Sequence, residues 1–204
     1  LDTLYYNSTT KCINIQELMA KNMSMAKNMS KNSIKRGNYF SKITGLDIID
    51  NELVTTLNSG YLLYFNIDDN YSLKKIVNLR TEKMRFNNFS GVISSVFVNS
   101  KELYLYYTAD FKGENLLIVD HVLISGDSVS SRMPKVLTNE KFDDSDLGGA
   151  FVDLGDSLLL AVGKGTHELV GETTVRLQQS NSVFGKTIVI PKINQQFGKE
   201  CKII

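Results

Sequence analysis

Short runs of β-branched and aromatic residues, separated by Gly, Asn and Asp, occupy the chain from Tyr39 onward. Runs of this kind are typical of consecutive antiparallel strands. Three stretches repeat one order: a small residue, a first strand, a hairpin and an outer strand. They open on Gly45, Gly91 and Gly149 and cover about residues 43–80, 89–138 and 147–204. The pattern predicts an all-β fold in which each repeat contributes four strands.

The length of this repeat favours one architecture. A unit of roughly 40 to 50 residues with four strands is the signature of a β-propeller blade, because each sheet needs neighbours to bury both of its faces. We therefore expect residues 39–204 to form about three blades. A sandwich of the same strands, or two small barrels, are the alternatives, and the recurring order within each repeat favours the propeller.

The preceding segment has a different period. Apolar residues recur at spacings of three and four between residues 14 and 30, which predicts one amphipathic helix. Residues 31–37 are mostly polar or charged and end in Gly, as is typical of a linker. We expect a helical lead over residues 1–38, with the helix packed on its own protein.

The composition excludes several classes of function. Among 204 residues, 23 basic and 22 acidic side chains leave a net charge of +1, so we expect no nucleic-acid partner. No apolar run reaches the roughly eighteen residues of a membrane helix, so we expect no transmembrane segment. Cys12 and Cys201 fit no metal-binding spacing and leave two alternatives open, inert thiols or a disulfide in an oxidising compartment.

The third repeat contains three motifs in a characteristic order and spacing: Gly148-Gly149, the strand from Leu158 to Gly163, and Phe184-Gly185-Lys186. The second repeat adds the stretch GVISSVFVNSKELYLYYTADFKGENLLIVDHVLI. Over about residues 40–204 the chain thereby resembles the soluble quinoprotein glucose and aldose-sugar dehydrogenases, the glucose/sorbosone dehydrogenase family. The resemblance implies a six-bladed propeller, a secreted or periplasmic location, and sugar oxidation with pyrroloquinoline quinone (PQQ).

The catalytic positions that the resemblance implies are altered. In family members that oxidise sugars, a His two positions before the Gly-Gly pair removes the hydroxyl proton of the substrate. The matching residue here is Asp146, and an exposed Asp has a pKa near ~4, which suits a base at neutral pH poorly. The Arg after the Gly-Gly pair is replaced by Ala150, and the family's Gly-Asp after the hairpin by Gly163-Lys164.

The part of the family pattern that holds PQQ lies further downstream and has no counterpart before Ile204. PQQ carboxylates would lack the charged partners found there. We therefore expect no catalysis by this chain. The alternative is that it forms part of a PQQ-dependent sugar dehydrogenase that oxidises an aldose, and PQQ and Ca²⁺ are expected only under that alternative.

Other residues offer chemistry with less context. His167, next to Glu168 in a loop, is a candidate displaced base or metal ligand, against the simpler interpretation of a solvated His. His121 lies among apolar residues, which indicates a partly buried strand position. Acidic clusters at residues 68–70 and 143–146 contain oxygen ligands for Ca²⁺, but neither has the spacing of an EF-hand.

Three blades would expose apolar sheet faces to water at both ends of the stack. We therefore expect the chain to be the N-terminal half of a six-bladed propeller, completed by a second half-propeller, a second copy, another protein subunit or a missing continuation of the chain. The expected function is a non-catalytic binding or assembly platform. Since the first residue is Leu1 rather than Met, we also expect that an N-terminal segment has been removed.

Overall fold

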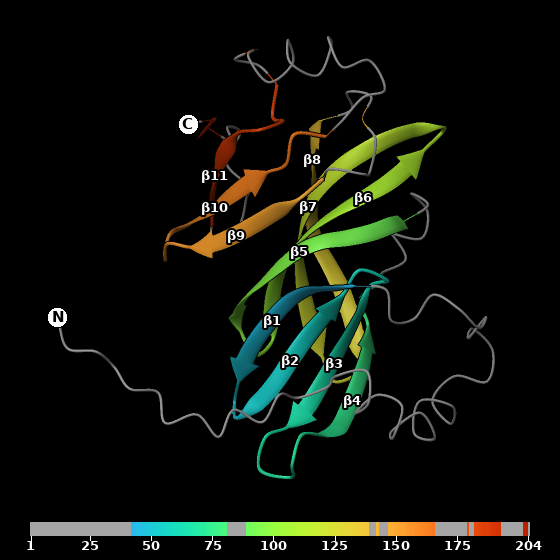
Figure 1. The fold of residues 1–204 in the computed structure, drawn as a ribbon, viewed down its shortest axis with the longest axis vertical. Helices are drawn as coiled ribbons and strands as arrows, with labels where there is room; N and C mark the ends of the chain where they lie inside the picture. The colour runs from blue at the N-terminus through green and yellow to red at the C-terminus, as the bar shows by residue number, and fades with distance from the viewer. Residues whose placement is uncertain are drawn as a thin grey trace, which may run out of the picture.

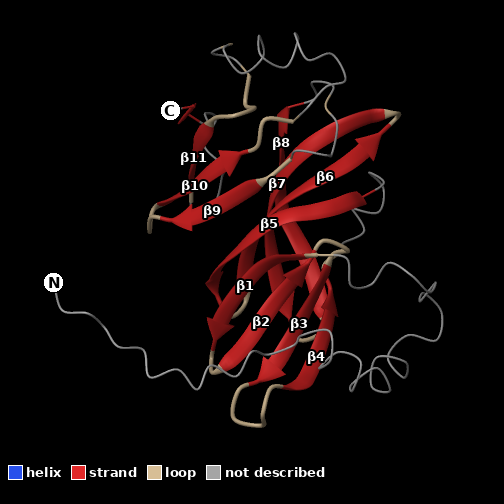
Figure 2. Ribbon diagram, viewed as in Figure 1, coloured by secondary structure: helices blue, strands red, loops and turns tan. Residues whose placement is uncertain are grey.

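The computed structural model describes residues 42–80, 89–138, 142, 147–165, 179, 182–192 and 202–203. Within these residues the fold is all-β, with strands joined by turns and loops and no helix (Figure 2). The helix and linker predicted over residues 14–37 lie outside the described residues, as do Cys12 and Cys201. In the part of the chain that is described, no helix has the length and apolar character needed to cross a membrane.

Twelve strands form three four-stranded sheets, each from four consecutive strands in chain order (Figure 1). The first sheet contains β1 (Ile43–Ile49), β2 (Glu52–Leu57), β3 (Tyr61–Asn66) and β4 (Ser72–Asn78). The second contains β5 (Phe89–Asn99), β6 (Glu102–Phe111), β7 (Glu114–Ser125) and β8 (Ser128–Thr138). The third contains β9 (Gly149–Asp153), β10 (Ser157–Val162), β11 (Thr187–Pro191) and β12 (Lys202–Ile203). All neighbouring strands pair antiparallel, which confirms the predicted four-strand groups.

Tight turns form at positions that the sequence marks. Lys112 and Gly113 have φ angles of 56° and 83° and join the paired residues Phe111 and Glu114. Two consecutive residues with positive φ are typical of the type I′ turn, whose twist matches that of the strands it connects. This hairpin fixes the register of β6 against β7.

The second sheet is buried on both faces. Along β6, Leu103, Leu105 and Tyr107 contact a core shared with the first sheet, whereas Tyr104 and Tyr106 contact a core shared with the third. This alternation follows from the two-residue period of a strand, which sends successive side chains to opposite faces. The three sheets are therefore stacked face to face, with the second in the middle.

The first strands of the three sheets are neighbours. The strand β5 packs beside β1 on one side and beside β9 on the other, as Figure 1 shows. None of these strands is hydrogen-bonded to another of the three as a sheet neighbour. They lie side by side at the junction of separate sheets.

The outer face of the first sheet is largely covered. The side chains of Leu57, Leu63 and Phe65 on this face are buried, together with Leu73. The exposed part of the face is at β1, where Leu46 and Ile48 are 64% and 66% exposed. Burial on this face thus decreases from β3 toward β1.

The outer face of the third sheet is open and apolar. The pairing register places mainly apolar residues on it, Ala150, Val152, Leu159, Ala161 and Val189, together with the polar Ser157 and Thr187. None is fully buried, and Val152 is 53% exposed. The opposite face carries Leu158, Leu160 and Ile188, which are buried against the second sheet. The third sheet is therefore apolar on both faces but buried on one.

Candidate functional site

The three motifs of the third repeat lie together in the fold. The Gly163 amide donates a hydrogen bond to the Gly148 carbonyl oxygen at 2.6 Å, and the Gly185 amide donates to the Gly163 carbonyl oxygen at 3.1 Å. The Gly-Gly strand start, the end of β10 and the loop before β11 are thus joined through their main chains. These motifs build the edge of the third sheet where β9 begins.

A buried aromatic ring stabilises this junction. Phe184 is completely buried, and the ring centroid of Phe142 lies 5.6 Å from that of Phe184. Gly165 has a φ angle of +51°, and a Cβ atom there would lie 2.6 Å from the Phe184 ring. Both the backbone conformation and the contact therefore require glycine at this position.

Each opening glycine lies where a side chain from another part of the fold comes close to the backbone of its strand. A Cβ atom at Gly45 would lie 2.1 Å from the Ser95 Oγ atom. One at Gly149 would lie 2.6 Å from the Tyr106 ring. Both contacts are with side chains of the second sheet, so these two glycines allow β1 and β9 to approach it.

The remaining opening glycine, Gly91 of the second repeat, leaves room for the Asn58 side chain. Asn58 and Val92 are joined there by two hydrogen bonds, which we call the clamp. A Cβ atom at Gly91 would lie 2.7 Å from the Asn58 Nδ2 atom. That amide donates to the Val92 carbonyl oxygen at 3.0 Å, while the Val92 amide donates to the Asn58 carbonyl oxygen at 2.9 Å. Two hydrogen bonds thereby tie the turn after β2 to the free edge of β5.

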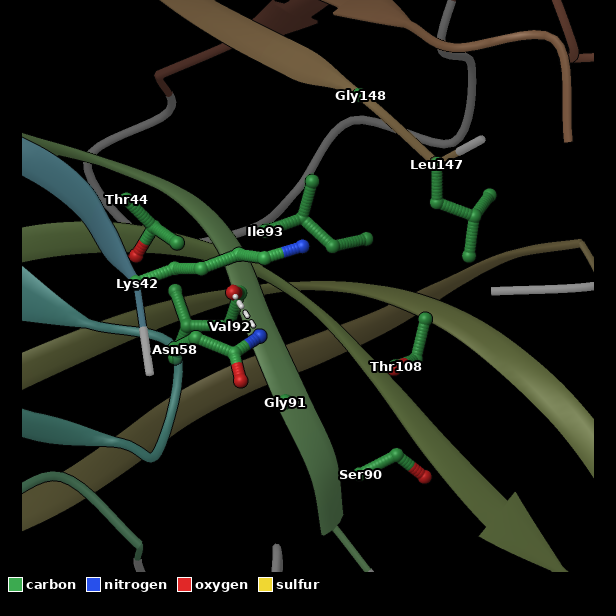
Figure 3. A pocket seen from close by; sticks show the side chains of 10 residues that line it. All are labelled: Lys42, Thr44, Asn58, Ser90, Gly91, Val92, Ile93, Thr108, Leu147 and Gly148. Atoms are coloured by element: carbon green, nitrogen blue, oxygen red, sulfur yellow. Dashed lines mark hydrogen bonds between the residues drawn. The ribbon is translucent and has the colours of Figure 1, made fainter. Parts of the chain in front are cut away.

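A cavity of about 530 Å³ lies where β1, β5 and β9 begin (Figure 3). Its lining comes from the first two sheets, from the turn after β2 and from the residues just before β1 and β9. The lining residues are Lys42, Thr44, Asn58, Ser90, Gly91, Val92, Ile93, Thr108, Leu147 and Gly148. This is the candidate functional site, because it combines a concave shape with converging polar groups from separate elements.

The polar groups of the cavity are one cation, three hydroxyls and one amide. Lys42 is exposed, and Figure 3 shows its side chain extending across the cavity toward Ile93. Thr108 is only 5% exposed. The Thr44 hydroxyl contacts the Thr56 carbonyl oxygen at 3.4 Å. The aliphatic side chains of Ile93 and Leu147 also line the cavity.

Both catalytic candidates from the sequence, Asp146 and His167, lie outside the described residues. Leu147, which follows Asp146 in the chain, lines the cavity. Ala150 lies instead on the outer face of the third sheet, and Lys164 is exposed and does not line the cavity. The described cavity is therefore formed by other residues.

The sequence interpretation missed Lys42, Asn58 and Thr108 as site residues. Asn58 stands in an Asn-Ser-Gly turn, which indicates a hairpin and nothing about the next repeat. A usable signal was the equivalence of the three opening glycines, since residues beside them meet if the first strands are neighbours. Such a rule would have selected Lys42 and Ser90 as well as Leu147.

The described lining does not fit PQQ. This cofactor has three carboxylates, and tight binding requires several charge-assisted partners. Lys42 is the one cationic side chain among the described lining residues. Two carboxylates of the cofactor would therefore remain without a cationic partner at this cavity.

The described residues contain no group of three or more His, Cys, Asp or Glu side chains arranged to hold a metal ion. Asp68 and Asp69, considered for Ca²⁺, form turn hydrogen bonds instead. Asn51 Nδ2 donates to Asp68 Oδ2 at 2.6 Å, and Ser72 Oγ donates to Asp69 Oδ2 at 2.6 Å. The acidic residues at 143–146 lie outside the described part of the chain.

His121 lies away from the cavity, on β7. Its ring stacks on Tyr104 with centroids 4.6 Å apart, and its Nε2 atom lies 3.2 Å from the Glu102 carboxylate. Burial lowers the pKa of His121, and the contact with Glu102 partly opposes that effect. The predicted partly buried strand position is confirmed.

No protein-family model matches the chain, and no curated protein matches its sequence. The resemblance to the quinoprotein dehydrogenases therefore stays a prediction from the sequence motifs.

Proposed function

We propose that residues 39–204 form three blades of a β-propeller of the quinoprotein-dehydrogenase type and serve as a non-catalytic binding or assembly platform. Three consecutive four-stranded antiparallel sheets support this proposal. So does the arrangement of β1, β5 and β9 side by side, with apolar cores between successive sheets. Propeller blades pack in this way around a central axis lined by their first strands.

The single observation that carries the assembly function is the open apolar face of the third sheet. The second sheet has the same two-faced apolar pattern and is covered on both sides. A face with Val152, Leu159 and Val189 gains stability when another sheet removes these side chains from water. Full burial is worth about 1.5–3 kcal/mol for a large aliphatic side chain.

The proposed covering element is a further four-stranded sheet from a second half-propeller, a second copy or another protein subunit. Sheets of this type pack with interdigitating side chains, as the second and third sheets already do. A secreted or periplasmic location belongs to the same proposal, since it rests on the family resemblance.

The non-catalytic part of the proposal follows from the substituted positions. Ala150 replaces the Arg of the family and presents a methyl group on the outer face of the third sheet. The cavity provides one ammonium group among its described lining residues, Lys42. These groups can bind and position a ligand, and none of them is a base suited to remove a hydroxyl proton.

The assembly is tested by size-exclusion chromatography with light scattering on the full chain. At tens of micromolar we expect a mass above the 22.9 kDa of one chain, because the open face associates. Replacing Val152→Lys should restore the mass of one chain. Val136→Lys is the matched control, because Val136 is 49% exposed on β8, away from this face.

Two results would contradict the proposal. A stable single chain, with a mass that neither substitution changes, would remove the assembly function. Dye-linked aldose oxidation by the assembled protein with PQQ and Ca²⁺, lost on Asp146→Ala, would show that the platform is catalytic.

A further inference from the structure

We propose that the cavity at the starts of β1, β5 and β9 binds small monocarboxylates that also carry hydroxyl groups. This inference extends the proposed binding function to a class of ligand. It stands independently of the assembly, because Val152 and the other residues of the open face do not line the cavity.

The charge of the cavity matches a single carboxylate. Lys42 provides one ammonium group, and no described lining residue is acidic. Within the described chain Lys42 forms no ion pair. One ligand carboxylate can therefore pair with it, whereas a second or third would be desolvated without a cationic partner.

The remaining polar groups match ligand hydroxyls. Thr44, Ser90 and Thr108 place three hydroxyl groups around the cavity. A hydroxyl can rotate to donate or accept, so it pairs readily with the hydroxyls of a polyol. Asn58 is fixed in place by its bonds to Val92, which gives this side of the cavity a rigid wall.

The size and the aliphatic part of the lining match a compact carbon skeleton. Ile93 and Leu147 provide aliphatic side chains in the lining beside the polar groups. About 530 Å³ lies within the range of small-molecule pockets. A six-membered ring with one carboxylate and several hydroxyls has suitable dimensions and chemistry.

A substitution at Gly148 can test the cavity without disturbing the rest of the fold. A Cβ atom at this position would meet no atom within 4 Å, and its φ angle is not in the left-handed region. Since Gly148 lines the cavity and has open space around it, we expect a larger side chain there to narrow the cavity without displacing the fold. Gly149, by contrast, would collide with the Tyr106 ring and cannot serve this purpose.

The test is isothermal titration calorimetry of the full chain with three probes. Quinate has one carboxylate and several hydroxyls, myo-inositol has hydroxyls and no charge, and citrate has three carboxylates. We expect quinate to bind at least about tenfold more tightly than either of the others, as one charge-assisted pair would give. Equal or tighter binding of myo-inositol or citrate, or no binding of quinate, would overturn the proposal.

Three variants locate the binding. Lys42→Gln should raise the Kd for quinate at least about tenfold, and Gly148→Leu should abolish binding while the far-ultraviolet circular dichroism stays unchanged. Lys101→Gln is the control, since this exposed lysine lies in the turn between β5 and β6, at the other end of β5 from the cavity. If the control weakens quinate binding as much as Lys42→Gln does, the site is elsewhere.

The two proposals fail separately. Loss of quinate binding in Gly148→Leu leaves the mass measured by light scattering as it was. Conversely, Val152→Lys changes the mass and leaves quinate binding intact.

Discussion

At Gly165, the absence of a Cβ atom allows the loop after β10 to pack against Phe184, in the loop before β11. The residue has a φ angle of +51° and lies against the buried Phe184 ring. The ring in turn lies in the core that joins the third sheet to the second. One glycine therefore links a local backbone conformation to the packing of two sheets.

We expect Gly165→Ala to destabilise the chain by about 2 kcal/mol or more, since strain at positive φ and a steric collision add together. Gly148→Ala is the matched control and should change the free energy of unfolding by less than about 0.5 kcal/mol, because its Cβ atom meets nothing. Urea unfolding monitored by circular dichroism measures both. Equal losses in the two variants would contradict the role of the Phe184 contact.

The glycines also show how far residue-level prediction reaches. The sequence marks Gly45, Gly91 and Gly149 as the starts of strands. It does not indicate why glycine is needed, because the partner atoms belong to Ser95, Asn58 and Tyr106, which are distant in sequence or belong to other sheets. The position of a small residue is local information, whereas the contact that requires it is not.

At the scale of elements, the free edge of β5 is stabilised by a neighbouring sheet. Asn58 bonds to both main-chain groups of Val92, one through its side chain and one through its backbone. An unpaired strand edge would otherwise expose these groups. The clamp thus fixes the position of the first sheet relative to the second.

We expect Asn58→Ala to lower the free energy of unfolding by about 1–2 kcal/mol, because the Val92 carbonyl group, in a buried residue, loses its side-chain donor. Asn115→Ala is the control, since its amide makes one longer bond of 3.3 Å from an exposed residue. Its effect should stay below about 0.5 kcal/mol. If both variants unfold at the same denaturant concentration, the clamp contributes nothing specific.

The element boundaries show where the sequence pattern was sufficient. Gly60 and Gly113 lie in the observed hairpin turns, as expected for glycines that separate strand-like runs. The sequence pattern of the second repeat favours an outer strand only at Lys135-Val136-Leu137, but β8 spans Ser128–Thr138. Its first half is polar, and it forms because it pairs with β7 and because Ser131 donates to Asp120 Oδ1. Pro134 is tolerated there because β8 is an edge strand.

At the scale of the molecule, the stacked sheets bury groups whose titration affects global stability. His121 lies in the region where the second sheet faces the third, near Glu102 and Arg132, and burial lowers its pKa. The unfolded chain therefore takes up this proton at a higher pH than the folded chain does. The contribution of His121 is fully present above the unfolded pKa of about 6.5 and is lost as the pH falls below it.

We expect the free energy of unfolding of the wild type to fall between pH 7.5 and 5.5, and the His121→Gln variant to show a smaller fall. The variant also loses the stacking contact with Tyr104, so the slope with pH, rather than the absolute stability, is the measurement. Urea unfolding at several pH values gives it. A steeper slope in the variant would mean that the Glu102 contact, rather than burial, dominates the pKa.

The all-β class and the grouping of strands could be predicted because both follow from period and turn chemistry along the chain. The cavity could not, because Lys42, Thr108 and Leu147 meet only when three sheets stack with their first strands adjacent. Sheet stacking is set by side-chain volumes across sheet interfaces, which no local pattern encodes. The site is thus a product of the arrangement of repeats rather than of any one repeat.

The unequal ends of the stack determine how copies can add to one another. Head-to-tail addition would require the open face of one copy to meet the first sheet of the next, where Leu63 and Phe65 are already buried. Among the described residues, the exposed side chains of that face lie at β1, where Leu46 and Ile48 are located. Under the proposed assembly, two copies would associate through their third sheets, and such a two-fold contact closes after two chains. A pair closed in this way would place the first sheets of the two copies at its outer ends.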